Sequence, residues 1–227
     1  YTRFNQLNES EDIKMDILET MKARHSVRQY KNQAIESSKR EKINALIKDV
    51  NAESKLSIQV FYDEPKCFDS FMAHYGKFEN VKNYIAIVGN KNDQEKAGYY
   101  GEKIVLKCQK LGLNTCWVAM THGKSKAQIK RGQKLLIIIS LGYGETQGVP
   151  HKSKSIAELG QADQKNEWFE KGMEAVSLAP TAVNQQKFYF ELKNGIVTAK
   201  NLGGFYSRID LGIVKYHFEA VTGHEVK

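Results

Sequence analysis

Several features that define other classes of protein are scarce or missing in this sequence. It has three cysteines, Cys67, Cys108 and Cys116, an odd number with neither a CxxC pair nor a zinc-ligand spacing to a histidine. We therefore expect reduced thiols and no metal site. No apolar run approaches the roughly 20 residues that a membrane helix needs, and residues 1–10 show no apolar stretch behind a basic flank. We expect a soluble, cytoplasmic protein that has no secretory signal and no membrane partner.

Acidic residues are fewer than basic ones, 26 against 34, so the formal net charge is +8. Such a surface attracts nucleic acid, an anionic membrane or a phosphorylated small molecule, and the charge alone does not choose among them. The lysines are spread along the chain, without a dense basic tract or a stripe of arginine and aromatic residues. The pattern therefore favours no nucleic-acid partner, although a basic scaffold that binds nucleic acid is an alternative interpretation.

The hydrophobic pattern predicts helices and strands throughout the 227 residues, enough for one large domain or two small ones. Predicted helices cover 11–24, 38–50, 97–111, 167–178 and 208–221, with a brief one over 126–130; predicted strands cover 57–62, 84–88, 113–118, 134–141, 188–192 and 196–200. Gly112 is placed to end the third of these helices, and Asn194-Gly195 is a strong hairpin signal.

The charged stretch over residues 149–160 separates two parts of the chain whose elements follow a related order. After it, an amphipathic helix, a loop and strands follow one another again, as they do near the start. We therefore predict a structural duplication, with residues 11–155 as the first half and residues 156–227 as the second, packed as one globular unit.

The segment Arg24-His25-Ser26-Val27-Arg28 directly follows the first predicted helix. In extended backbone, alternate side chains share a face, so two guanidiniums with a hydroxyl between them can converge on one phosphate. A solvated basic helix end, where arginine offsets the negative end of the helix dipole, would have the same residues. Both interpretations stay open for this segment taken alone.

Three further segments could contribute to a binding site. The amides and small residues of 179–186 suit the polar edge of a flat heteroaromatic ring, but also an ordinary capped turn. Residues 111–120 could direct backbone N–H groups into a pocket, or simply be core. Lys152 and Lys154 lie at alternate positions and could complete an anion site, or lie free on the surface.

Together and in this order, the four segments resemble the FMN-dependent nitroreductase superfamily, over most of the chain. The resemblance implies an α+β fold with a mixed, mainly antiparallel sheet flanked by helices and two pseudo-symmetric halves. It implies that Arg24, Ser26 and Arg28 hold the FMN phosphate, and His25 could add a further donor.

The same resemblance assigns roles to the two segments in the middle of the chain. The basic pair Lys152 and Lys154 would reach back to the phosphate. The backbone of Ala119 and Met120 would lie near the reactive N5 of the flavin.

The loop that in the family reads Ala-Pro-Ser-x-x-Asn-x-Gln-Pro is displaced in this chain. It normally follows the phosphate segment, but residues 49–61 contain nothing like it, whereas residues 179–186 do. The implied cofactor contacts in this loop are Pro180, Thr181, Ala182, Asn184 and Gln186. Because the loop crosses the dimer interface in typical members, the chain resembles a single-chain subgroup, a monomer that mimics the family dimer and holds one FMN.

The implied function is an FMN-dependent oxidoreductase that uses NADH or NADPH to reduce nitroaromatic, quinone or similar small acceptors by ping-pong hydride transfer. The protein then binds and orients the cofactor, so no dedicated catalytic residue is expected. Asp210 is interpreted as a helix-start or interface residue. The alternative is a flavin-binding or redox-sensing protein without efficient turnover. No glycine-rich βαβ fingerprint separates NADH from NADPH.

Overall fold

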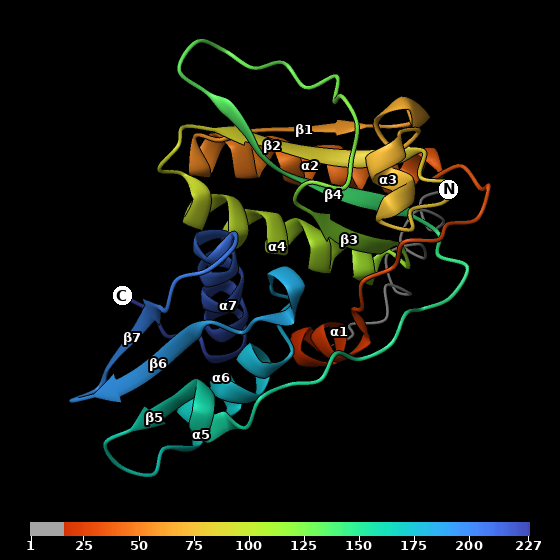
Figure 1. Ribbon diagram of the computed structural model, residues 1–227. Helices are drawn as coiled ribbons and strands as arrows, with labels where there is room; N and C mark the ends of the chain where they lie inside the picture. The colour runs from red at the N-terminus through yellow and green to blue at the C-terminus, as the bar shows by residue number, and fades with distance from the viewer. Residues whose placement is uncertain (1–15) are drawn as a thin grey trace, which may run out of the picture.

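The computed structural model describes residues 16–227 and contains two sheets with helices between them (Figure 1). The larger sheet is antiparallel, in the order β1-β2-β4-β3, and consists of β1 (Ser57–Phe61), β2 (Asn83–Gly89), β3 (Asn114–Val118) and β4 (Lys134–Gly142). The smaller sheet consists of β5 (Gly160–Ala162), β6 (Phe188–Lys193) and β7 (Ile196–Asn201). In it, β5 is parallel and β7 antiparallel to β6.

The helices cover the larger sheet and join it to the smaller one. They are α1 (Ile17–Ala23), α2 (Ser37–Ser54), α3 (Phe71–Tyr75), α4 (Gln94–Lys110), α5 (Ile156–Leu159), α6 (Glu167–Ser177) and α7 (Ser207–Thr222), with the 3₁₀ turns η1 (Pro65–Cys67) and η2 (Ala182–Asn184). In Figure 1, α4 and α7 lie between the two sheets. None of the helices in residues 16–227 combines the length and apolar content needed to cross a bilayer.

Both faces of the larger sheet are buried, which explains why β2 is apolar along most of its length. Ile85 and Ile87 belong to the core shared with α2 and α4. Tyr84 and Ala86, on the opposite face, pack with the aromatic residues of segment 65–81. Because successive side chains of a strand point to opposite faces, this alternation places a helix layer on one side and segment 65–81 on the other.

Helices α4 and α7 touch through their backbones where two glycines meet the facing helix. A Cβ atom added to Gly98 would lie 2.0 Å from the carbonyl oxygen of Ile209, and one added to Gly212 would lie 1.9 Å from that of Glu95. Only glycine allows backbones to approach this closely. The same core cluster continues across this contact, from α2 to β7.

The predicted α+β fold with a mainly antiparallel sheet is confirmed, and all six predicted strands are present within a residue or two. Gly112 has the positive φ of a left-handed helix stop, and Asn194 and Gly195 both have positive φ, as a type I′ hairpin requires. Residues 11–15 of the first predicted helix lie outside the described residues. The division into two related halves at 155/156 stays a prediction.

The predicted helix over residues 126–130 is wrong, because this stretch is irregular. Its backbone groups bond to side chains of the sheet instead of to one another. The N–H of Lys126 donates to the Tyr84 hydroxyl over 3.0 Å, and the Gln59 amide exchanges two 2.9 Å hydrogen bonds with the backbone of Gln128. These contacts replace the helical ladder. Conversely, the stretch between β1 and β2, for which no helix was predicted, contains α3.

Candidate functional site

The segment after α1 is extended and runs beside β3, at the edge of the larger sheet. The N–H of Val27 donates to the Thr115 carbonyl over 3.0 Å. Val27 and Tyr30 are buried in the core beneath, while Ser26 and Arg28 face away from it and line two adjoining cavities. Arg24, Ser26 and Arg28 therefore line one cavity, as expected for an extended Arg-x-Ser-x-Arg segment, and His25 lines it as well.

An apolar cavity of about 380 Å³ lies between this segment, the end of β3 and the start of α7. This volume falls in the range of small-molecule pockets. Its walls are mainly hydrophobic, and they are formed by Ser26, Arg28, Met72, Tyr75, Cys116, Trp117, Ala119, Met120, Thr121, Ile137, Pro180, Thr181, Ala182, Val183, Phe205, Tyr206, Ile209, Asp210 and Ile213.

A second cavity of about 300 Å³ adjoins the first and is basic. Its lining residues are Arg24, His25, Ser26, Arg28, Val149, His151, Pro180, Thr181, Val183 and Asn184. Five residues line both cavities, namely Ser26, Arg28, Pro180, Thr181 and Val183. The basic cavity thus opens beside the apolar one, and the early segment and the late turn form walls of both.

The positive charge of the basic cavity comes mainly from its two arginines. Burial, together with the charge of Arg24, lowers the pKa of His25, and burial also lowers the pKa of His151. Both imidazoles are therefore less readily protonated than free histidine. Arg28 is exposed, and its guanidinium lies 5.8 Å from the centre of the Phe78 ring.

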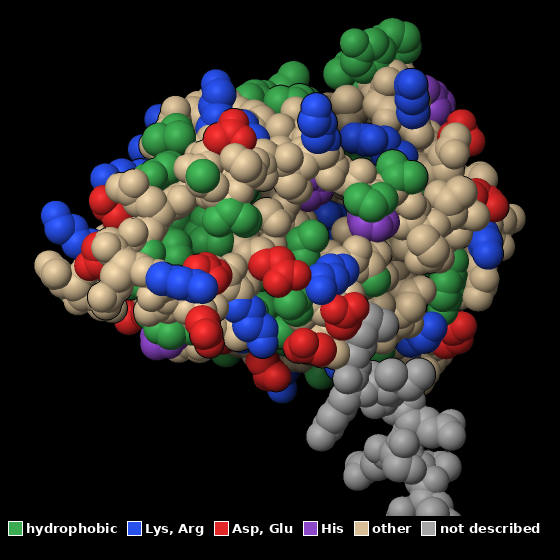
Figure 2. Space-filling view, turned by 90° about the horizontal axis from the view of Figure 1, so that it is seen from below, with side chains coloured by type: hydrophobic (Ala, Val, Ile, Leu, Met, Phe, Trp, Pro, Cys, Tyr) green, Lys and Arg blue, Asp and Glu red, His purple; other side chains and the backbone are tan. Residues whose placement is uncertain are grey.

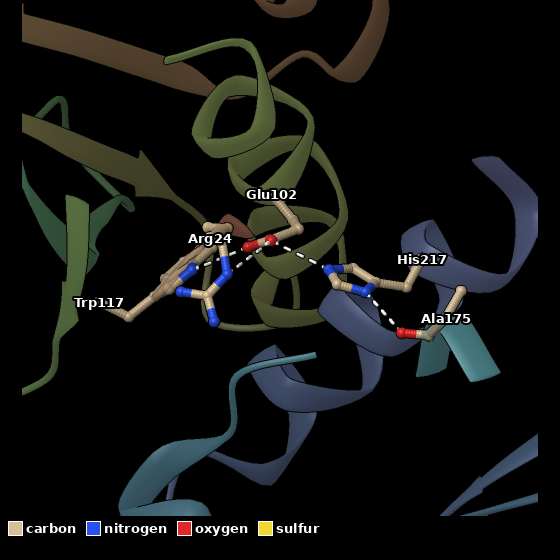
Figure 3. A network of polar contacts seen from close by, with 5 residues as sticks. All are labelled: Arg24, Glu102, Trp117, Ala175 and His217. Atoms are coloured by element: carbon tan, nitrogen blue, oxygen red, sulfur yellow. Dashed lines mark hydrogen bonds and ion pairs between the residues drawn. The ribbon is translucent and has the colours of Figure 1, made fainter. Parts of the chain in front are cut away.

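Arg24 differs from Arg28 because it is buried, with 2% of its surface exposed. Its Nε lies 3.9 Å from a carboxylate oxygen of Glu102, and neither Nε nor Nη1 has a hydrogen-bond partner. In Figure 3 the terminal nitrogens lie on the side of the guanidinium away from Glu102. Burial lowers the pKa of Arg24, and the Glu102 charge opposes that effect. Buried guanidinium nitrogens are normally hydrogen-bonded, so Nε and Nη1 of Arg24 lack the acceptors that such atoms usually have.

The late turn, residues 180–186, adopts a strained conformation beside both cavities. Val183, Asn184 and Gln186 have φ of 47°, 53° and 47°, in the left-handed region that a β-branched residue such as Val183 rarely occupies. The Thr181 hydroxyl accepts the N–H of Gln186 over 3.1 Å. Strain of this kind persists where surrounding contacts impose it, which is common at ligand sites.

Asp210, in the first turn of α7, holds this turn against the apolar cavity. Its carboxylate accepts the N–H of Ala182 over 2.9 Å and the side-chain amide of Gln185 over 2.8 Å. Burial raises the pKa of Asp210 to about 6, although both hydrogen bonds oppose the rise. The prediction that Asp210 is a helix-start or interface residue agrees with these contacts.

We expect the stability of the protein to depend on the ionisation of Asp210. An acid whose pKa is raised from 3.8 to about 6 on folding destabilises the folded state as pH rises through that range. The loss between pH 4 and pH 7 is about 2 kcal/mol. Urea unfolding of wild type and Asp210→Asn over this range measures it, because the asparagine variant does not titrate at this position. A constant difference in unfolding free energy between the two proteins would contradict the assignment.

The cavities bring together ten of the residues predicted to bind the cofactor. Those in the walls are Arg24, His25, Ser26, Arg28, Ala119, Met120, Pro180, Thr181, Ala182 and Asn184. Lys152, Lys154 and Gln186 line neither cavity. The Lys154 ammonium donates to the Gln186 carbonyl over 3.1 Å, and the Asn184 and Gln186 amides each donate to the Lys152 carbonyl over 2.9 Å. Through these hydrogen bonds, the charged stretch over residues 149–160 holds the late turn in place.

Sequence reasoning missed several residues of the cavity walls. Trp117 lies in a segment that was singled out, but no role was assigned to its ring. Tyr206 donates its hydroxyl to the Ala119 carbonyl over 3.3 Å and so joins α7 to the end of β3. Met72, Tyr75 and Phe205 were not recognised. The available signal was the density of aromatic residues in the segment around α3.

Two further cavities, lined mainly by residues of α4, α7 and the C-terminal segment, contain none of the residues predicted to bind the cofactor. On the face seen from below Figure 1, acidic and basic side chains are interspersed (Figure 2). Within residues 16–227, no three His, Cys, Asp or Glu side chains converge as ligands for a metal ion. The two adjoining cavities are therefore the candidate site.

Comparisons with known proteins find one matching family model and similar solved structures. The family model described as "Putative TM nitroreductase" matches residues 16–222. A "putative nitroreductase" from Thermotoga maritima has a TM-score of 0.66 and 24% identity, covering 91% of this chain and 83% of that one. A "putative nitroreductase" from Desulfovibrio desulfuricans, in complex with FMN, has a TM-score of 0.50 and 15% identity, covering 63% of this chain and 94% of that one.

At these identities the two solved structures show similarity of fold alone. A comparison with curated proteins finds no match. The family model, in contrast, extends over nearly all of the described chain. On the strength of that match, the chain belongs to the nitroreductase superfamily.

Proposed function

We propose that this protein is an FMN-dependent oxidoreductase that uses NADH or NADPH to reduce nitroaromatic, quinone or similar small acceptors by a ping-pong reaction. The observation that carries the proposal is the pair of adjoining cavities, one apolar and one basic, that share five wall residues. A planar ring system joined to a phosphate has the same division into an apolar and an anionic part. The FMN complex of the Desulfovibrio desulfuricans protein supports the choice of flavin.

The residues present fit FMN. The buried Nη1 of Arg24 has no protein partner, and Arg24 and Arg28 together place two positive charges in the walls of the basic cavity. A phosphate accepts several charge-assisted hydrogen bonds, which are stronger than neutral ones. We therefore assign the phosphate to Arg24, Ser26 and Arg28, with Lys152 and Lys154 acting through the late turn that they hold.

The apolar cavity would hold the ring. Bound FMN supplies the electron-accepting ring system, so the protein contributes binding, orientation and electrostatics. The late turn forms one wall, and Asp210 fixes it through Ala182 and Gln185. The Tyr206 hydroxyl donates to the Ala119 carbonyl, which stabilises the backbone at the end of β3. All of these walls come from one chain, which supports a monomer with one FMN.

Exposed hydrophobic side chains surround the mouth of the apolar cavity. Tyr75 is 75% exposed and Val183 is 83% exposed, and Met120 and Phe205 are also largely accessible. An apolar rim favours flat, weakly polar acceptors, because their binding removes apolar surface from water. If both stack on the same face of the ring, the nicotinamide donor and the acceptor occupy the same place in turn, which is the physical basis for expecting ping-pong kinetics.

Turnover of nicotinamide cofactor by the purified protein tests this proposal. We expect a flavin absorbance spectrum that bleaches on reduction, and repeated oxidation of NADH or NADPH when a quinone or nitroaromatic is present. Double-reciprocal plots at several acceptor concentrations should be parallel. The control is free FMN at the same concentration without protein, which should oxidise the nicotinamide far more slowly.

Two outcomes would count against the proposal in different ways. Bound flavin with a single reduction and no repeated turnover would indicate a flavin-binding or redox-sensing protein. No flavin binding, with or without added FMN, would remove the cofactor assignment altogether.

A further inference from the structure

The carboxylate of Glu102, in the middle of α4, is completely buried beneath the basic cavity. Its Oε1 lies 3.0 Å from Nε2 of His217 on α7 and 3.9 Å from Nε of Arg24. Its Oε2 accepts a 2.9 Å hydrogen bond from the Trp117 indole. Figure 3 shows the carboxylate lying between the Arg24 guanidinium and the His217 ring. One acid therefore touches a wall residue of each cavity and a buried histidine.

The hydrogen bonds indicate that Glu102 is ionised. Burial by itself raises the pKa of Glu102, but the hydrogen bond and charge of His217, the charge of Arg24 and the Trp117 hydrogen bond outweigh it and lower the pKa. Nδ1 of His217 faces the Ala175 carbonyl at 2.8 Å and must donate to it, since a carbonyl only accepts. Nε2 faces the Glu102 carboxylate at 3.0 Å.

Arg24 has no other acidic partner. Among the described residues, Glu102 is the one carboxylate within 4 Å of its guanidinium, and the contact is an ion pair without a hydrogen bond. A buried arginine with a purely structural role normally has its donors satisfied, because unpaired buried charge is costly. The arrangement around Arg24 is therefore incomplete until another anion is present.

We propose that Glu102 is a positioning residue that acts as the counter-ion of Arg24 before the cofactor phosphate binds. Its carboxylate balances the charge of the buried guanidinium, and Arg24 lines the basic cavity while its Nε and Nη1 lack hydrogen-bond partners. The phosphate then supplies the missing acceptor. This inference rests on the proposed function, since it takes the phosphate of FMN to be the ligand of the basic cavity.

Because the Glu102 carboxylate and the phosphate both interact with Arg24, the effect of removing one should depend on whether the other is present. Removing the charge of Glu102 should destabilise the unliganded protein more than the phosphate-bound protein. Glu102→Gln keeps the volume, and its amide oxygen can accept from Trp117 while its nitrogen donates to a neutral His217 ring. The variant thus removes the charge and retains the hydrogen bonds. Glu95→Gln, a half-exposed acid on the same helix, is the matched control.

Melting temperatures without ligand, with riboflavin and with FMN test the proposal. We expect unliganded Glu102→Gln to melt on the order of 10 °C below wild type, as the loss of a buried charge partner implies. FMN should restore stability and riboflavin, which lacks the phosphate, should restore much less. The additional stabilisation by FMN over riboflavin should be several degrees larger in Glu102→Gln than in wild type or Glu95→Gln.

A comparison of inorganic phosphate with chloride tests the proposal without flavin. At matched ionic strength, phosphate should stabilise Glu102→Gln more than chloride does, and by more than in wild type. If wild type binds no FMN, the proposed function fails, whereas this comparison still reports on Arg24 and Glu102. The double variant Arg24→Gln with Glu102→Gln should be more stable than Glu102→Gln alone and should show a smaller preference for FMN over riboflavin than Glu102→Gln does.

The proposal is overturned if Glu102→Gln melts like wild type, or if FMN and riboflavin stabilise it by the same additional amount as they do wild type. If the unliganded variant does not fold, refolding in the presence of each flavin replaces the melting curves. Recovery of native circular dichroism with FMN and not with riboflavin supports the counter-ion role. Equal recovery with both flavins, or recovery with neither, contradicts it.

Discussion

Gly98→Ala is expected to destabilise the protein by about 3 kcal/mol, at the upper end of the usual range for overpacking. The added Cβ would lie 2.0 Å from the Ile209 carbonyl oxygen, which is helix backbone and cannot rotate away. Helix α7 must therefore move, and with it Asp210 and Tyr206, which form walls of the apolar cavity. We expect FMN affinity to fall together with stability. Urea unfolding and flavin titration measure the two effects.

Lys110→Ala, at the exposed end of the same helix, is the control for this change. It should alter the unfolding free energy by no more than about 0.5 kcal/mol, as for most surface substitutions. Gly212→Ala, on the facing helix, should reproduce the loss seen for Gly98→Ala. A Gly98→Ala protein as stable as the control would show that the two helices do not make the close contact described.

Arg28→Gln is expected to weaken FMN binding by about 10- to 100-fold while leaving the fold intact. Arg28 is exposed and lines both cavities, and no carboxylate of the described residues lies within 4 Å of it as an ion-pair partner. Losing a hydrogen bond to a charged group costs about 1.5–3 kcal/mol, which corresponds to this range. Fluorescence titration of the unliganded protein with FMN measures the change.

Riboflavin separates a phosphate contact from a ring contact in this experiment. Its affinity should change much less than that of FMN, because it lacks the phosphate. Arg40→Gln, an arginine on α2 that pairs with Asp63, should leave both affinities unchanged. Equal losses of FMN and riboflavin affinity in Arg28→Gln would place Arg28 at the ring, and no loss of either would remove it from the site.

The predicted site residues that the structure brings together in the cavities are those in which local geometry follows from local pattern. Arg24, Ser26 and Arg28 share a face because the backbone between them is extended, and the late turn is recognisable from its amides and its proline. The strands are predictable because apolar residues form short runs ended by glycine or polar residues.

Other features depend on contacts between distant segments and have no local signature. Gly98 and Gly212 each look unfavourable in a helix, and only their meeting explains them. Glu102 and His217 lie 115 positions apart, and nothing near either residue predicts the pair. The alternate spacing of Lys152 and Lys154 suggested an anion site, but spacing does not determine direction, and the Lys154 ammonium bonds to the Gln186 carbonyl.

The incorrect prediction of a helix over residues 126–130 shows that secondary structure, too, can depend on contacts between distant segments. Its residues are compatible with a helix, but Tyr84 and Gln59 of the sheet satisfy its backbone groups from outside. Tertiary contacts therefore decide the conformation where the local preference is weak.

The most direct test of the account is an experimental structure of the protein with FMN bound. We predict one FMN per chain, with the ring in the apolar cavity and the phosphate in the basic cavity, within hydrogen-bond distance of the guanidiniums of Arg24 and Arg28. An FMN bound elsewhere, or a phosphate far from both arginines while the two cavities stay empty, would contradict it.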